Sequence, residues 1–443
     1  MMIDSRALTW HHLFPSDTTF TVRNGPEAFQ RSLETLNTGS RGSVLVSWGD
    51  RPQDLPNLAP YMGVVAVNGR GITPDTLRAA GFSHVRRFAV LPNMEDARWF
   101  VPLESRKVAT EAIRIHSCFR LLAQAKHAAA VMAARTGATF LFRNQIIVAQ
   151  RTMPPLEEAL RTALPGIDIR LALSSGTPGP ARKPTISVLD VNGNWHAFVK
   201  LARTGLSREL VEKEANALRH LAEIPAVADR VPELLFGMDI DGTFAAAQRA
   251  LPGVMSGPDL TPAHADLLRA FSIGPEKKVS DTEFMHSLSR RMHSTTLPDP
   301  RLVTAFELVS KVLGNAVVPQ TIVHGDFAPW NLRSHDGQLR AFDWETAHID
   351  GLPLLDEVQY HIQAGVLLRD WTDEQAFDHL LAFESIQEGP RFEPYVIRAL
   401  QIAGLLESIL RHEAEGRPQS ARSNLLNRYL IDRLIDHMAR EMA

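Results

Sequence analysis

The chain has 443 residues, which corresponds to about three domains at roughly 150 residues each. Its 47 Lys and Arg side chains against 50 Asp and Glu give a formal charge of −3, which excludes a global basic field for nucleic acid or anionic lipid. A single cysteine, Cys118, excludes an internal disulfide, and neither a secretory leader nor an apolar segment of about 20 residues is visible. We therefore expect a cytoplasmic protein with no membrane span and no nucleic-acid partner.

The first third of the sequence alternates between short strands and helices. Thr73 and Pro74 form a helix-start signal for a helix over 74–80, and a long helix is predicted over 108–134. Alternation of this kind indicates a small α/β domain, which we place at residues 1–152, before the break at Pro154. The predicted strands of this domain are 43–47, 63–67, 84–91 and 139–148.

From residue 167 onward, strands follow one another at close spacing and are joined by turns rather than helices. This pattern predicts an antiparallel meander with strands at 167–174, 185–189 and 195–202, followed by a helix over 207–221. After Gly253 the sequence is mostly helical. We therefore expect a β-rich lobe over 153–253 and a helical lobe over 254–443.

One strand-rich island, 321–344, interrupts the helical lobe and carries a group of oxygen-bearing side chains. An apolar strand leads into a loop with Asp326, and Asn331 follows five positions later. The hairpin signal Asp336-Gly337 then returns the chain, so that Asp343 lies near the loop. Such oxygen ligands suit Mg²⁺, and the Asp326–Asn331 spacing equals that of a protein-kinase catalytic loop.

The β-rich lobe offers a cation that fits the other half of a phosphate site. In the strand 195–202, Lys200 shares one face with Phe198, while the alternate residues are apolar. Glu214 lies on the apolar stripe of the following helix, together with Val211 and Leu218. Because a charge in an apolar setting needs a partner, we expect Lys200 to pair with Glu214, as the pair that positions phosphates in kinases does.

Weaker signals surround this pair. The turn over 175–180, with Gly176 and Gly179, lies where a kinase folds a loop over the phosphates, although it does not fit the G-x-G-x-x-G pattern. Gln248 and Ala250 lie where the two lobes must join, so their backbone groups are candidates to contact an adenine edge. Trp330 either stacks on an acceptor or packs under the catalytic loop.

Taken together, these residues resemble the aminoglycoside phosphotransferase and choline kinase-like superfamily, which has the protein kinase-like fold. The resemblance extends from about residue 167 to the C-terminus and is most specific in the sequences HGDFAPWN, residues 324–331, and DWE, residues 343–345. It implies an α+β bilobal fold, behind the N-terminal α/β domain, and Mg²⁺-dependent transfer of a phosphoryl group from ATP or GTP to a small-molecule hydroxyl.

The resemblance also implies roles for single residues. Asp326 would be the catalytic Asp, Lys200 and Glu214 the pair on the nucleotide phosphates, and Asn331 and Asp343 the metal ligands. The remaining nucleotide-binding candidates are Gly176, Gly179, Gln248 and Ala250.

Two other interpretations stay open. The chain is alternatively a pseudokinase-like scaffold whose residues 1–152 recruit a protein partner, or a bifunctional protein with a second activity in that segment. The order of the domains is similar to that of proteins associated with bacterial cell-surface glycan synthesis, which favours a sugar or polyol as the acceptor. An amino alcohol is a third candidate for the acceptor.

Overall fold

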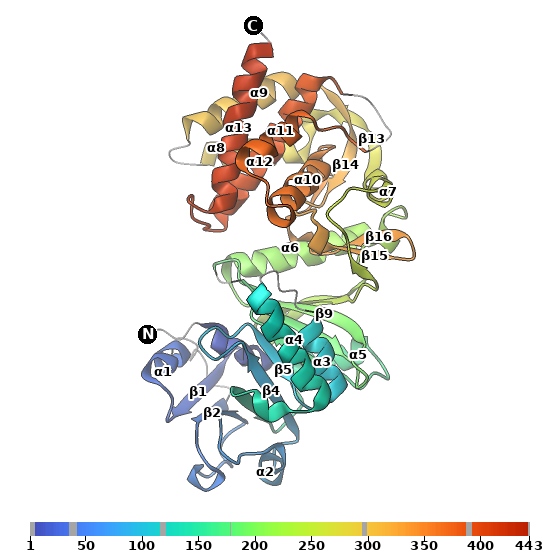
Figure 1. Cartoon of the computed structure of the whole chain (residues 1–443). Coiled ribbons are helices and arrows are strands. Elements are labelled where there is room, and N and C mark those ends of the chain that lie inside the picture. The colour runs from blue at the N-terminus through green and yellow to red at the C-terminus, as the bar shows by residue number, and fades with distance from the viewer. Residues whose placement is uncertain are drawn as a thin grey trace. The chain divides into compact units, whose positions relative to one another are not determined.

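The computed structural model describes residues 5–34, 42–115, 121–177, 179–294, 299–386 and 392–441 (Figure 1). Cys118 and Pro178, which lies in the predicted glycine turn, fall outside these ranges. The chain divides into two compact units, one of residues 1–212 with 234–250 and one of residues 213–233 with 251–443. Each unit is described by itself below.

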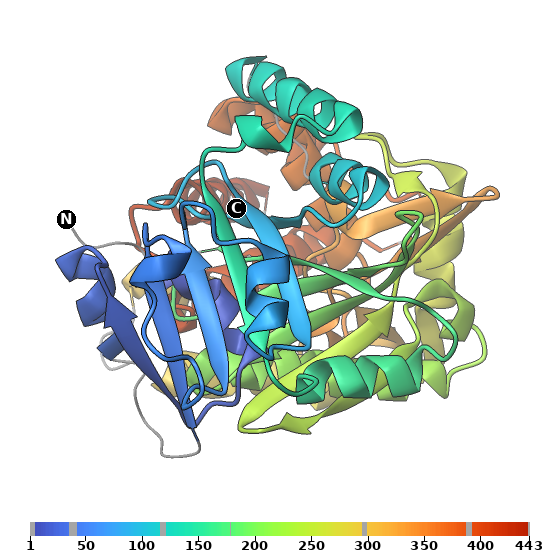
Figure 2. The ribbon, with the colours of Figure 1, turned by 90° about the horizontal axis from the view of Figure 1, so that it is seen from below.

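The first unit is built on a continuous eleven-stranded sheet in the order β1-β2-β3-β6-β4-β5-β7-β8-β9-β11-β10 (Figure 2). The three N-terminal strands pair in parallel, and the rest of the sheet is antiparallel. The strands are β1 (Thr18–Arg23), β2 (Gly42–Trp48), β3 (Gly63–Val67), β4 (His84–Leu91), β5 (Trp99–Pro102), β6 (Gln145–Gln150), β7 (Arg170–Ser174), β8 (Thr185–Leu189), β9 (Trp195–Ala202), β10 (Leu234–Ile240) and β11 (Thr243–Arg249).

Helices cover both faces of this sheet because its strands place alternate residues on opposite sides. In β2, Val44 and Val46 belong to the core under α1 and α5, whereas Leu45 belongs to the core under α2. The helical elements are η1 (Ser5–Leu13), α1 (Glu27–Glu34), α2 (Pro74–Ala79), α3 (Arg106–Arg114), α4 (Leu121–Thr136), η3 (Thr139–Leu141), α5 (Pro155–Ala163) and the first part of α6 (Gly205–Ala222).

The structure agrees with most of the predicted elements of this unit. The side chain of Thr73 accepts the amide hydrogen of Thr76, with Pro74 at the first helical position, as the helix-start signal predicted. The meander β7-β8-β9 is antiparallel, and the α/β character of the N-terminal region is confirmed. The sheet runs across residue 152 through the pairing of β5 with β7. The domain boundaries at 152 and 253 remain predictions about function.

The prediction of one long helix over 108–134 is wrong. Two helices, α3 and α4, occupy this span and pack against each other through small apolar side chains. Ala109 and Ala112 of α3 share a buried cluster with Ala133 and Ala134 of α4. Apolar periodicity continues through both helices and therefore does not reveal that they are two helices packed against each other. The predicted strand over 139–148 is also later and shorter, because η3 precedes β6.

The second unit is mainly helical and carries two three-stranded sheets, β12-β15-β16 and β13-β14-β17. Its helices are the second part of α6, α7 (Pro262–Ala270), α8 (Glu283–Ser294), α9 (Pro300–Leu313), α10 (Leu355–Leu368), α11 (Asp373–Leu381), α12 (Pro394–Ala414) and α13 (Arg422–Glu441). The strands are β12 (Val254–Met255), β13 (Ser272–Lys278), β14 (Val317–Val323), β15 (Leu332–His335), β16 (Gln338–Ala341) and β17 (His348–Gly351).

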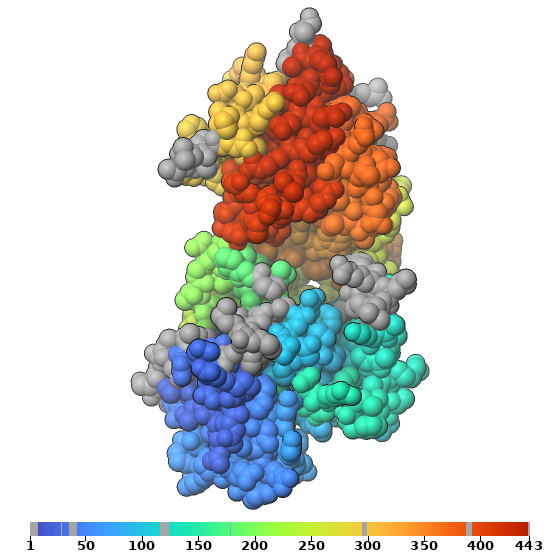
Figure 3. All heavy atoms as spheres, turned by 60° about the vertical axis from the view of Figure 1, so that its left-hand side comes forward, coloured from blue at the N-terminus to red at the C-terminus, as the bar shows by residue number. Residues whose placement is uncertain are grey.

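One large apolar core holds the second unit together. It joins α8, α9 and α10 to the two C-terminal helices, which lie against each other (Figure 3, orange to red). In α12, a run of fully buried residues that includes Leu400, Leu406 and Ile409 faces this core. None of the described helices combines the length and the hydrophobicity that a membrane crossing requires.

A buried histidine of this unit predicts sensitivity to acid. His264 accepts the amide hydrogen of Thr261 at Nδ1 (3.1 Å), and its Nε2 lies 3.1 Å from Ser256 Oγ. Burial lowers the pKa of His264 from 6.5 to about 4. As the pH falls, the His264 imidazole is therefore protonated in the unfolded state before it is protonated in the folded state. The stability that the neutral, buried ring contributes is complete above pH 6.5 and is lost as the pH falls toward 4.

Thermal unfolding at several pH values measures this effect. We expect the melting temperature of the wild-type protein to fall more steeply between pH 6.5 and 4 than that of His264→Asn. His220→Asn, at an exposed position of α6, is the matched control and should keep the wild-type slope. Parallel curves for His264→Asn and the wild type would contradict the assignment.

Candidate phosphoryl-transfer site

The loop that follows β14 is placed by a hairpin, as the sequence predicts. The strands β15 and β16 pair with Leu332 opposite Ala341, and the turn residues Asp336 and Gly337 have φ values of 50° and 76°. Both values are typical of the tight turn that favours Asp-Gly. The amide of Phe342 donates to the carbonyl oxygen of Asn331 (3.0 Å), so the hairpin returns the chain to the loop just before Asp343.

Asp326 is held from three sides. The side-chain amide of Asn331 donates both to the Asp326 carbonyl oxygen and to its Oδ2, each at 2.8 Å. The other carboxylate oxygen of Asp326, Oδ1, accepts from Gln363 Nε2 at 3.2 Å and lies 3.4 Å from Gln359 Nε2. These contacts with side-chain amides fix the Asp326 carboxylate in one orientation.

His324 connects this loop to the backbone just before Asp343. Its Nδ1 accepts the amide hydrogen of Asp326 (3.2 Å), and its Nε2 lies 2.8 Å from the carbonyl oxygen of Phe342. Because Nδ1 accepts from this amide, Nε2 is the nitrogen that donates to the Phe342 carbonyl oxygen. His324 is fully buried, so the geometry of Asp326 and the backbone before Asp343 depend on the same side chain.

Asp356, the second residue of α10, fastens the start of the loop. Its Oδ2 accepts the amide of His324 (2.7 Å) and its Oδ1 accepts the amide of Gly325 (2.9 Å). Asp356 is buried, and this burial raises the pKa of its carboxyl group against the opposing effect of His324 and the two amides. The Asp356 side chain thus positions the loop, and it is not among the residues that line the cavity beside Asp326.

We expect Asp356→Asn to fold but to lose most of its catalytic rate. The Asn side chain can accept from one amide, while its NH₂ group faces the other, and an unsatisfied buried donor costs about 1–3 kcal/mol. Calorimetric unfolding and steady-state kinetics would show a lower melting temperature and a reduced kcat with little change in KM for nucleotide. A wild-type kcat in this variant would contradict the positioning role.

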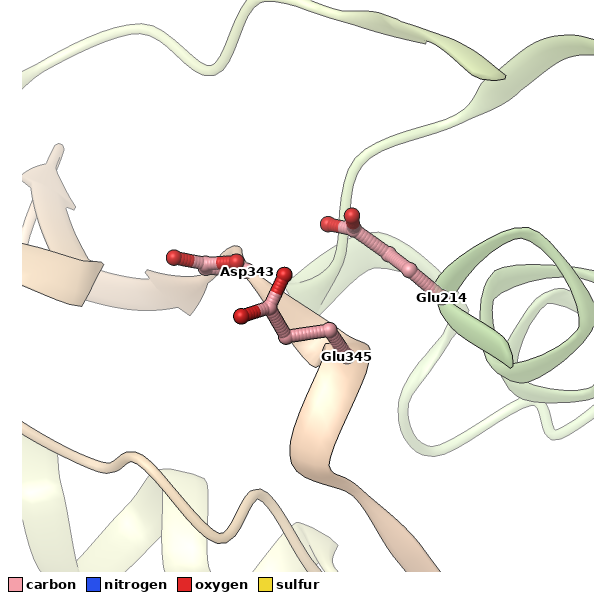
Figure 4. A group of neighbouring side chains, drawn as sticks. All are labelled: Glu214, Asp343 and Glu345. Atoms are coloured by element: carbon pink, nitrogen blue, oxygen red, sulfur yellow. The ribbon is translucent and has the colours of Figure 1, made fainter. Parts of the chain in front are cut away.

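Three carboxylates of the second unit form the group that is best suited to a cation among the described residues. Oxygen atoms of Glu214, Asp343 and Glu345 all lie within 4.8 Å of one another (Figure 4). Glu214 comes from α6 and is fully buried, whereas the other two follow β16. Asp343 has a left-handed backbone, with φ 72° and ψ 59°, which turns the chain just after the strand. All-oxygen ligation of this kind fits Mg²⁺.

A comparison with known sequence families identifies the domain that carries these residues. The profile of the phosphotransferase enzyme family matches residues 179–375, which include the loop, the hairpin and Lys200. Over these residues the chain is similar to the phosphotransferase enzyme family. The match confirms the predicted family, the kinase-like fold class and the phosphotransferase enzyme class.

Solved structures with a similar arrangement have low sequence identity to this chain. A thermostable mutant of the aminoglycoside phosphotransferase APH(4)-Ia is 18% identical, with 64% of this chain and 99% of that chain covered and a TM-score of 0.43. A choline/ethanolamine kinase family protein from Mesorhizobium loti is 16% identical, with 64% and 93% covered and a TM-score of 0.36. No curated protein matches the sequence.

The structure places the remaining predicted residues of the phosphotransferase domain in the first unit. Lys200 lies in the middle of the sheet, opposite Thr185 of β8 and Ala246 of β11. Gln248 is buried in β11, and the amide of Ala250 donates to the carbonyl oxygen of His196 (2.9 Å). The division between the units falls directly after Ala250, within the segment expected to join the lobes.

The predicted glycine turn also lies in the first unit, between β7 and β8. Gly176 has a φ of 73°, and a Cβ at this position would lie 2.5 Å from the Lys183 carbonyl oxygen, so only glycine fits. Gly179 also has a positive φ, 139°, but open space around its Cα. The roles of both glycines in nucleotide binding remain predictions.

Glu214 occupies the position that helical periodicity predicted. It is fully buried on the same stripe as Val211 and Leu218. The structure therefore brings Glu214 and Asp343 together in the second unit, and it joins Asn331 to Asp326 by hydrogen bonds. The pairing of Lys200 with Glu214 remains a prediction.

Sequence analysis missed the residues that surround Asp326 from the C-terminal helices. A cavity of about 400 Å³ opens beside Asp326 and is lined by Trp330, by α10 with Gln359 and Gln363, and by α12 with Arg411. Arg411 donates to the carbonyl oxygen of Gly325 (3.3 Å), directly before Asp326. The available signal was weak: a pair of glutamines four residues apart on a helix with a mixed sequence. Trp330 lines the cavity, which favours stacking on an acceptor over packing under the loop.

Proposed function

We propose that this protein is a Mg²⁺-dependent small-molecule kinase that transfers the γ-phosphoryl group of ATP or GTP to an acceptor hydroxyl. The observation that carries this proposal is the double hydrogen bond of Asn331 to Asp326, which aims a fixed carboxylate into an open cavity. After the hairpin that follows this loop, Asp343 joins Glu214 and Glu345 in the carboxylate group suited to Mg²⁺. A general acid-base group and a metal-binding group joined by one hairpin are the parts that phosphoryl transfer needs.

In the proposed reaction, the acceptor hydroxyl lies in the cavity and hydrogen-bonds to Asp326. The hydroxyl oxygen forms a bond to the γ-phosphorus while the bond from that phosphorus to the β–γ bridging oxygen breaks. The nucleoside diphosphate leaves with the bridging oxygen, and the hydroxyl proton passes to Asp326. Because the transition state is loose, Asp326 orients the hydroxyl more than it deprotonates it, and positioning supplies most of the rate.

The other predicted residues have supporting roles in this proposal. Asn331 and Asp343 would hold Mg²⁺, which supplies charge neutralisation on the phosphates when it is bound. Lys200, oriented by Glu214, would contact the nucleotide phosphates. The turn with Gly176 and Gly179 would contact the nucleotide phosphates, and the segment with Gln248 and Ala250 would contact the base.

The competing function is a pseudokinase-like scaffold that uses residues 1–152 to recruit a protein. Differential scanning fluorimetry with Mg·ATP and Mg·GTP, each repeated with EDTA, separates the two functions. A kinase should show a metal-dependent rise in melting temperature with one or both nucleotides, because ligands that bind the native state stabilise it. The absence of any shift with either nucleotide would favour the scaffold.

Transfer itself is tested with γ-labelled nucleotide and a panel of alcohols that spans sugars, polyols, amino alcohols and aminoglycosides. We expect label to move to an acceptor only when Mg²⁺ is present. Metal-dependent nucleotide binding without transfer to any acceptor or to water would contradict the kinase proposal while leaving the binding site intact.

A further inference from the structure

Two of the carboxylates that line the cavity beside Asp326 already have arginine partners, and this pairing restricts the acceptor. The inference below rests on the proposed function, because it assigns the substrate class of the same site. Among the described residues, four carboxylates and three guanidinium groups line the cavity: Asp326, Glu345, Glu407, Glu415, Arg411, Arg417 and Arg422. Asp326 and Glu345 belong to the proposed catalytic and metal-binding groups, so two carboxylates remain that an acceptor cation might use.

Both of these carboxylates are already paired with arginines. Glu407 Oε2 lies 3.5 Å from Arg411 Nε, and its other oxygen lies 3.4 Å from Arg291 Nη2. Glu415 lies 2.8 Å from Arg417 Nε and 3.7 Å from Arg411 Nη1. Burial raises the pKa of Glu407, but Arg411, together with His348 and Arg291, outweighs burial and holds this pKa well below its usual range.

The third guanidinium of the lining is also paired, because Arg422 forms an ion pair with Asp373, outside the cavity lining. An acceptor with several ammonium groups would therefore meet Arg411 and Arg417, while Glu407 and Glu415 are already occupied by arginines. Burying an unpaired charge in such a place is costly.

The rest of the lining is largely apolar and follows one face of α10. Val358, Ile362 and Val366 recur at every fourth position and line the cavity beside Gln359 and Gln363, which contact Asp326. Val358 and Ile362 are buried. The helix thus offers a polar stripe that leads to the reacting carboxylate and a parallel apolar stripe. Further apolar lining comes from the other helices, at Leu400, Leu405 and Leu426.

We infer that the acceptor is an uncharged alcohol with an apolar body, and not a polycationic aminosugar. Its hydroxyl lies at the polar stripe with Asp326, and its apolar part lies along Val358, Ile362 and Val366. Removal of the apolar part from water supplies binding free energy, while Glu407 and Glu415 are already paired with arginines and so attract a further cation less.

Gly404 of α12 provides a variant that narrows the cavity without disturbing the core. It lines the cavity, and a Cβ at this position would meet only Leu355 Cδ2, at an ordinary 3.4 Å. A leucine at this position would project into the space that the apolar body occupies, and replacing glycine in a helix interior does not disfavour the helix. Ala414→Leu, at the exposed end of the same helix, adds the same side chain away from the cavity.

The probes are octyl glucoside below its micellar concentration, glucose and kanamycin, and the full-length protein is used. We expect calorimetry to show at least tenfold tighter binding of octyl glucoside than of glucose, with no binding of kanamycin. Gly404→Leu should weaken octyl glucoside binding at least tenfold, with an unchanged melting temperature and unchanged Mg·ATP binding. Ala414→Leu should match the wild type.

Tighter binding of kanamycin than of octyl glucoside, or equal octyl glucoside binding in Gly404→Leu and wild type, would overturn the inference. These measurements need no catalysis, so they are independent of the kinase test. If Mg·ATP binding and transfer are absent but the octyl glucoside result holds, the proposed function fails while the cavity assignment stands. If transfer occurs with kanamycin as the preferred acceptor, the kinase stands and the acceptor class is wrong.

Discussion

Replacing Asp326 with Asn should abolish phosphoryl transfer while Mg·nucleotide binding persists. Asn cannot take the hydroxyl proton, and its amide group cannot accept from both Asn331 on one side and Gln363 on the other. Loss of a general acid-base group lowers rates by about 10²–10⁴-fold. We therefore expect kcat to fall by about that factor in an assay with labelled nucleotide, and the affinity from fluorimetric titration to stay at the wild-type value.

Asp336→Asn is the matched control for this substitution. Asp336 lies ten residues along the chain, its side chain is 88% exposed, and its φ of 50° is one that asparagine adopts readily. The same chemical change should therefore leave both kcat and nucleotide affinity unaltered. Full activity in Asp326→Asn would refute the catalytic assignment, whereas a joint loss of binding and rate would indicate that the substitution disturbed the loop.

Replacing Asp343 with Asn should instead weaken metal-dependent nucleotide binding. The change removes one charge from the carboxylate group that Asp343 forms with Glu214 and Glu345. Asparagine is preferable to alanine because Asp343 has a left-handed backbone, φ 72°, in which alanine would add strain of its own. We expect at least about a tenfold loss of Mg·ATP affinity, or ~1.4 kcal/mol, measured by calorimetry over a range of Mg²⁺ concentrations.

Excess Mg²⁺ distinguishes a metal-binding role from general damage to the fold. A weakened metal site should recover part of its nucleotide affinity as the Mg²⁺ concentration rises, and the melting temperature without nucleotide should stay near that of the wild type. Asp336→Asn, also at a left-handed position, again serves as the control. Unchanged affinity in Asp343→Asn at low Mg²⁺ would remove Asp343 from the metal site.

The sequence was most informative where chemistry and local structure coincide. The Asp336-Gly337 turn is a short-range signal, and the hairpin around it has the predicted pairing. The five-residue spacing from Asp326 to Asn331 fixed which side chains could meet, and the structure joins them by hydrogen bonds. Likewise, helical periodicity alone placed the buried Glu214 on its apolar stripe.

Long-range contacts were less accessible from the sequence. Nothing local in Trp99–Pro102 indicates that β5 pairs with β7 and makes a single sheet of the whole first unit. The division of this span into α3 and α4 was missed for a similar reason, since apolar spacing continues through both helices. Strand neighbours and helix reversals depend on packing partners distant in the chain, which no short window contains.

The near-neutral composition excluded a protein that binds nucleic acid or anionic lipid through its overall charge, and the motif around Asp326 and Asn331 predicted a phosphotransferase. These conclusions came from the sequence because reacting groups must be of particular residue types at particular spacings. Only the tertiary structure decided what surrounds Asp326. Gln363 and Arg411 lie on helices distant in sequence, and the pairing of Glu407 with Arg411 depends on how those helices pack. Since the pairing of charges in a cavity is a property of packed neighbours, the inference about the acceptor class depends on the fold and not on the motif.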